Sequence, residues 1–124
     1  YWMRLSDEQA SALYPPESVF DLRVRWMGEQ ARLAVDLPSG AYTMTIRAQA
    51  FDVARLLTIR DADSTLGTVE IAAGALMDYS IDFDAETVML DLISDGTRSP
   101  ADAGRGEDTR QLAIMIDSIV FTRK

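Results

Sequence analysis

Apolar and polar residues alternate with a period of two through the middle of this 124-residue chain. In residues 32–37, and again in residues 42–48, every second side chain is apolar. Successive side chains of a β-strand point to opposite faces of a sheet, so this pattern predicts strands with one buried face. The turn residues Pro38, Ser39 and Gly40 separate the two segments, which are predicted to pair as a hairpin.

Strand patterns continue to the C-terminal end of the chain. The further segments predicted as strands are residues 56–60, 67–71, 79–83, 88–94 and 111–122. The last of them has an expected irregularity at Asp117 and Ser118. Residues 95–109 are rich in Gly, Pro, Asp and Ser, and this composition predicts a long loop. Seven or eight short, evenly spaced strands favour an all-β fold, a jelly-roll-like antiparallel β-sandwich.

A short N-terminal helical turn is predicted in addition. Residues 6–9 read Ser-Asp-Glu-Gln, which is the capping-box pattern of a helix start. Residues 10–13 are predicted to continue this helix for one or two turns. Pro15 and Pro16 then end it, because proline cannot donate the next backbone hydrogen bond.

The length is typical of one domain, so residues 1–124 are expected to form a single β-sandwich domain. The chain begins with Tyr1 rather than Met, and we therefore expect this domain to be excised from a larger protein. Its core is predicted from the inward-facing aliphatic residues Leu33, Val35, Ile46, Ile59, Ile81, Leu90, Leu92, Ile114 and Ile116.

The composition argues against several functions. The chain has no Cys and no His, which removes thiolate metal sites and any Ser–His–Asp set, so we expect no enzyme. The net charge is −8 and Lys124 is the one lysine, so we expect no nucleic-acid partner. No apolar run approaches the roughly 20 residues that span a bilayer. The positive charges are almost all arginine, which suggests a bacterial source, and the sequence does not indicate whether the protein is located in the cytoplasm or in the cell envelope.

Four acids, Asp78, Asp82, Asp84 and Glu86, form a row in the segment 78–86. Paired carboxylates hydrolyse glycosides when they are held about 5 to 9 Å apart. However, alternation alone accounts for these acids, and we interpret them as a solvated strand face.

The turn Asp61-Ala62-Asp63 opens like a calcium-binding loop. An EF-hand loop needs glycine at its sixth position and an acid at its twelfth, where this chain has Leu66 and Ala72. We therefore interpret the turn as a polar hairpin tip. A calcium site formed by other carboxylate and carbonyl oxygens remains an alternative, but no motif supports it. No cofactor is therefore expected.

Two further groups of residues are candidates for ligand binding. The first group is Tyr14 and Glu17, followed by Trp26. An exposed aromatic ring stacks on the apolar face of a sugar, and a nearby carboxylate binds the sugar hydroxyls. The alternative is that Trp26 belongs to the core. Asp108 and Arg110 end the long loop. They either pair with each other and pin the loop, or present the arginine to a ligand.

Read together, these groups resemble a known family. The segments that carry the resemblance are residues 14–17, 25–28, 31–37, 99–102 and 108–113, followed by a final apolar strand. In this order they resemble accessory jelly-roll domains, similar to carbohydrate-binding modules, that are fused to bacterial glycosyltransferases and other envelope-polysaccharide enzymes. The resemblance spans residues 14–121. It implies a ligand site formed by Tyr14, Glu17, Trp26, Asp108 and Arg110.

Two functions are therefore expected. The first is a non-catalytic module that holds a polysaccharide near the catalytic domain of its parent enzyme. The second is a docking β-sandwich that binds protein, either the parent enzyme or a second copy. In a jelly roll the first and last strands are neighbours, so Glu17, Trp26, Asp108 and Arg110 are predicted to lie close together.

Overall fold

The computed structural model describes residues 2–3, 10–13, 17–19, 22–62 and 64–124, with side chains from residue 25 onward except 36 and 63. All regular structure in these ranges is β-strand. The strands are β1 (Trp2–Met3), β2 (Ala10–Leu13), β3 (Glu17–Val19), β4 (Leu22–Ala50), β5 (Arg55–Arg60), β6 (Thr65–Ile71), β7 (Met77–Ser94) and β8 (Ile114–Arg123). No helix there is long and apolar enough to cross a membrane.

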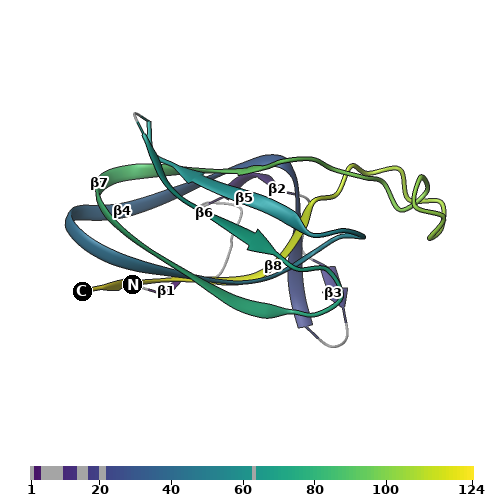
Figure 1. Cartoon of the computed structure of the whole chain (residues 1–124), viewed down its shortest axis with the longest axis horizontal. Helices are drawn as coiled ribbons and strands as arrows, with labels where there is room; N and C mark the ends of the chain where they lie inside the picture. The colour runs from purple at the N-terminus through teal and green to yellow at the C-terminus, as the bar shows by residue number, and fades with distance from the viewer. Residues whose placement is uncertain (1, 4–9, 14–16, 20–21, 63) are drawn as a thin grey trace.

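The strands pair antiparallel throughout, in the order β1-β8-β4-β7-β5-β6, and β2 and β3 also pair with β4. Figure 1 shows β4 and β7 bending round together at one end of the molecule, so each contributes to both layers of the sandwich. The prediction of an all-β, jelly-roll-like antiparallel β-sandwich is confirmed.

The predicted hairpin around Pro38 is wrong. Leu33 pairs with Leu90 and Met44 pairs with Ile81, so both halves of β4 pair with β7 and not with each other. The register shifts between Leu37 and Gly40, where the strand turns from one layer into the other. Alternation is the same for two paired strands and for two strands that face each other across a core, so the sequence pattern does not separate these cases.

The turn from one layer to the other is held by two side chains. The Tyr42 hydroxyl donates a hydrogen bond to the Pro38 carbonyl. Arg123 donates from Nη2 to the Ser39 carbonyl at 2.7 Å, and its guanidinium lies 5.9 Å from the centre of the Tyr42 ring. These contacts satisfy two backbone carbonyls that the sheet ladder leaves unpaired at a bend.

Residues 10–13 form strand β2, with Ala10 opposite Leu33, so the predicted continuation of the helical turn through these residues is wrong. The edge of β4 offers a ladder of backbone partners, whereas a helix of one or two turns is unstable alone. The capping-box residues 6–9 lie outside the described residues.

Between the layers lies the core. The largest side chains with almost no exposure are Phe121, Met27, Leu33, Leu37, Met44, Ile46, Leu57, Ile59, Ile71, Leu90, Leu92 and Leu112. The predicted core residues are all buried except Ile81, which is partly buried and packs against the core. Gly67 of β6 makes room for Ile81, since a Cβ on this glycine would lie 2.5 Å from Ile81 Cγ2.

The predicted irregularity in the last strand is confirmed as a β-bulge. Arg47 pairs with Ser118 and the next residue, Ala48, pairs with Ile116, so Asp117 is an extra residue in β8. A bulge of this kind increases the local twist of the strand. Beyond the bulge, the beginning of β8 pairs with both ends of β4, because Ile114 is opposite both Met27 and Ala50.

Candidate functional site

The two ends of β4 meet beside the start of β8. The Ala113 N–H donates to the Met27 carbonyl at 2.8 Å, and the Phe51 N–H donates to the Ala113 carbonyl at 2.9 Å. This arrangement brings together Trp26 and Phe51, which are distant in sequence. Their ring centres are 5.8 Å apart and their planes cross at 86°, an edge-to-face contact.

An arginine and a carboxylate lie next to this aromatic pair. The guanidinium of Arg105 is 5.5 Å from the centre of the Phe51 ring, within the range of a cation–π contact. Asp52 follows Phe51 and pairs with Arg98 at 2.8 Å and with Arg105 at 3.2 Å. Phe51 itself is 9% exposed, and the Arg105 guanidinium lies over its ring.

The loop between β7 and β8 carries both arginines and is ordered by its own hydrogen bonds. Arg98 and Leu112 exchange backbone hydrogen bonds of 2.9 and 3.0 Å at the base of the loop. Further out, the Ala101 N–H donates to the Asp108 carbonyl, and the Arg105 N–H donates to the Pro100 carbonyl. The prediction of a long loop in this region is confirmed. Its backbone is ordered by these hydrogen bonds, and Arg98 and Arg105 extend from it.

Of the predicted site residues, Trp26 lies inside β4, opposite Met115. Glu17 begins β3 with its backbone opposite Val24, and its side chain is outside the described part of the chain. Tyr14 is also outside it.

Asp108 and Arg110 pair with each other at 2.8 Å, and the Arg110 N–H also donates to Asp108 at 2.9 Å. The guanidinium hydrogen bond, helped by the backbone N–H, holds the pKa of Asp108 below its ordinary value. This contact agrees with the pinning role considered for the pair. The segment runs beside Gly28, since a Cβ on this glycine would be 3.3 Å from the Gln111 carbonyl.

Sequence reasoning missed Phe51, Asp52, Arg98 and Arg105. Phe51 and Asp52 follow the alternating segment 42–48 directly, and the arginines stand in a loop rich in turn residues. The position of residues 51 and 52 directly after a predicted strand could have marked them, because binding residues commonly lie in the loops that follow strands. Nothing in the sequence indicated that the two ends of one strand would meet there.

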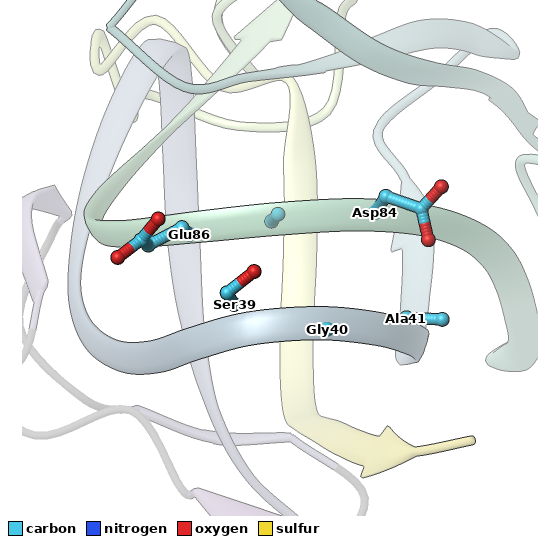
Figure 2. A pocket seen from close by; sticks show the side chains of 6 residues that line it. Ser39, Gly40, Ala41, Asp84 and Glu86 are labelled. Carbon is cyan, nitrogen blue, oxygen red and sulfur yellow. The ribbon is translucent and has the colours of Figure 1, made fainter.

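A second hollow lies where β4 and β7 bend between the layers. Figure 2 shows Asp84 and Glu86 on β7 beside Ser39, Gly40 and Ala41 on the paired strand β4. Together with Ala85, these residues line a space of about 410 Å³. Asp84 and Glu86 are part of the predicted acidic row. No aromatic ring lines this hollow, and the described residues contain no group of three or more acids placed to hold a metal.

The rest of the acidic row has the cross-strand partners of a solvated strand face. Thr43 donates to Asp82 at 2.6 Å, and Lys124 donates to Asp82 at 3.1 Å. The Thr43 hydroxyl first, and Lys124 next, lower the pKa of Asp82 below its ordinary value. Arg47 pairs with Asp78 at 3.3 Å on the same face.

At the tip of the hairpin formed by β5 and β6, the Asp61 carboxylate accepts a hydrogen bond from the Ser64 N–H at 2.7 Å, as is typical of a polar turn.

No protein-family model matches the chain, and no curated protein is similar to it in sequence. Several solved structures of similar fold are carbohydrate-binding modules. The family 6 module of a Cellvibrio mixtus lichenase 5A, in complex with cellotriose, is 15% identical over 94% of this chain and 90% of its own, with a TM-score of 0.56. A Clostridium stercorarium family 6 module, in complex with cellobiose, is 14% identical over 99% and 95%, with a TM-score of 0.61.

A third similar structure is the C-terminal family 6 module of a laminarinase from Zobellia galactanivorans. It is 13% identical over 99% of this chain and 100% of its own, with a TM-score of 0.60. At these identities the similarity establishes the fold. The chain therefore has the jelly-roll fold of carbohydrate-binding modules.

Proposed function

We propose that this chain is a non-catalytic carbohydrate-binding module whose site is the end of the sandwich that carries Trp26 and Phe51. The observation that supports it best is the aromatic pair beside a carboxylate and two arginines. Aromatic rings pack against the apolar face of a sugar, and charged groups form strong hydrogen bonds with its oxygens. The similar modules solved with cellotriose and cellobiose add support for this class of ligand.

The residues expected from the resemblance extend the proposed site. Tyr14, Glu17, Trp26, Asp108 and Arg110 are proposed to line it together with the aromatic pair. Glu17 lies opposite Val24, two residues before Trp26, and the loop residues before β8 lie beside Gly28. These positions place the backbone of Glu17 and the segment that follows Arg110 on either side of Trp26 along β4, and the predicted cluster of Glu17, Trp26, Asp108 and Arg110 stays a proposal.

The proposed parent is a bacterial envelope-polysaccharide enzyme, such as a glycosyltransferase, with this domain as its accessory module. Its catalytic domain and a polysaccharide would be the partners. The absence of His and Cys from the sequence supports a role without catalysis.

A docking sandwich that binds protein is the second candidate. The observation in its favour is a groove lined by Leu37, Pro38, Glu86, Thr87 and Val88, in which Val88 is 69% exposed. Exposed apolar surface of this kind commonly marks a protein interface.

The test is a glycan-array screen of the 124-residue chain, with and without calcium, repeated with Trp26→Ala and with Val88→Ala as the control outside the site. We expect glycan binding that Trp26→Ala removes while the melting temperature stays close to that of the parent chain. If Trp26 is instead a structural clamp, the same change lowers stability by about 3 to 5 kcal/mol. The absence of any glycan signal, or loss of binding only in Val88→Ala, would contradict the proposal.

A further inference from the structure

The sharpest backbone feature of the described residues lies at the proposed site. Asp52 has a φ of 69°, and no other described non-glycine residue has a positive φ. The Val53 N–H donates to the Phe51 carbonyl at 2.8 Å across it, which makes a three-residue γ-turn. Such turns with positive φ are rare and strained, and strain of this kind concentrates at ligand sites.

The strained turn directs the Asp52 carboxylate into the long loop. Its Oδ2 accepts from Nη1 of Arg98, and its Oδ1 lies 3.2 Å from Nη2 of Arg105. Nη2 of Arg98 donates to the Asp102 carbonyl at 2.8 Å. The Asp52 side chain is 14% exposed, whereas those of Arg98 and Arg105 are 46% and 57% exposed. One largely buried carboxylate therefore holds two accessible guanidinium groups side by side, and their positive charge exceeds its negative charge by one.

A third arginine lies at the base of the same loop. Arg55 covers Gly96, where a Cβ would be 2.7 Å from its Nη1. Its Nε is buried without a hydrogen-bond acceptor, and it has no ion pair within the described part of the chain. Segments 52–56 and 95–98 run together here, since the Asp95 N–H donates to the Leu56 carbonyl.

These contacts determine what kind of group the site accepts. Both Asp52 oxygens are occupied by arginines, and a guanidinium donates hydrogen bonds but accepts none. A ligand group that fits between Arg98 and Arg105 must therefore be an acceptor. A charged acceptor forms the stronger bond, and each guanidinium keeps N–H groups that Asp52 and the Asp102 carbonyl do not take.

We propose that this site takes an acidic saccharide, in which a carboxylate or sulfate lies between the guanidinium groups of Arg98 and Arg105 while the sugar ring packs on Trp26, the half-buried member of the aromatic pair. This inference rests on the proposed carbohydrate-binding function and names the ligand class. Asp52 is a positioning residue, since it acts by holding the two arginines. The nearby acids Asp95 and Asp102 are exposed.

The net charge of the chain makes the test selective. At −8, the field of the whole protein repels polyanions, so a preference for an acidic polymer requires a local site. The probes are polygalacturonate with its methyl-esterified form, and dextran sulfate with dextran. We expect at least one acidic polymer to bind about tenfold more tightly than its neutral counterpart, a difference of about 1.4 kcal/mol. The pair that shows the preference identifies carboxylate or sulfate.

Two variants and one control complete the experiment. Arg98→Gln with Arg105→Gln should remove the preference, and Arg105→Lys, which keeps the charge but loses the planar fork, should weaken it severalfold at an unchanged melting temperature. Arg60→Gln removes one positive charge from exposed β5, half the charge change of the double variant, and should bind as the parent chain does. Equal binding of acidic and neutral polymers, or an equal loss in Arg60→Gln, would overturn the inference. If neutral glycans still bind through Trp26, the proposed function stands; if no glycan binds, both fail.

Discussion

At the level of single residues, Asp52 combines a strained backbone with two ion pairs. Two substitutions at this position separate the contribution of the backbone strain to stability from that of the ion pairs. Asp52→Ala and Asp52→Gly both remove the carboxylate, but only glycine adopts a φ of 69° without steric cost. We expect Asp52→Gly to be about 0.5 to 1 kcal/mol more stable than Asp52→Ala in urea unfolding. Ala54→Gly, at an exposed neighbour without a positive φ, should instead lose stability. A more stable Asp52→Ala than Asp52→Gly would show that the turn is unstrained.

Asp108 makes a pH-dependent contribution to stability. Its hydrogen bonds with Arg110 lower its pKa in the folded chain, so its contribution is complete above the pKa of the unfolded chain, about 3.9, and is lost as the pH falls through the folded value. We expect Asp108→Asn to be less stable than the parent chain at pH 7, with the difference shrinking toward pH 2. Glu107→Gln removes one exposed carboxylate next to it and serves as the control. A difference that stays constant across this range would contradict the assignment.

The individual site residues that the sequence revealed were those with a local signal. Trp26 and Arg110 stand out by residue type and by their place near predicted strands. The contribution of Phe51 depends on Ala113, which hydrogen-bonds to both ends of β4. That contact joins segments far apart in the chain, and no local pattern encodes it.

At the level of strands, Gly67 lets β6 and β7 pack closely. A Cβ at this position would clash with Cγ2 of Ile81. Isoleucine is β-branched, so its side chain has little rotational freedom to move away. We expect Gly67→Ala to lower the free energy of unfolding by about 1 to 3 kcal/mol in urea. The loss should be much smaller in an Ile81→Ala background, and Thr68→Ala on the exposed face of β6 should have little effect. An equal loss in both backgrounds would place the strain elsewhere.

The same level explains which strands the sequence predicted well. The β5–β6 hairpin was predicted correctly because its turn is local, and Asp61 and Ser64 close it with hydrogen bonds. The two segments predicted around residues 79–83 and 88–94 are one strand, β7, which follows β4 through the bend. Whether a strand ends or bends depends on what it packs against, which alternation does not record.

For the whole molecule, the connection between fold and site lies in the start of β8. It fits between the two ends of β4, which closes that end of the sandwich and gathers Trp26, Phe51 and the long loop. Figure 1 shows this loop extending from the end of the molecule opposite the bend of β4 and β7. The proposed site and the acidic hollow of Figure 2 therefore lie in different parts of the structure.

That separation provides the most direct test of the central claim, that a saccharide binds at the end carrying Trp26 and Phe51. The measurement is amide chemical-shift mapping by NMR during titration with the glycan that binds best on the array. We predict that the largest shifts fall in residues 26–28, 51–53 and 98–110. Shifts confined to residues 39–41 and 82–88 would place the ligand in the acidic hollow and contradict the account.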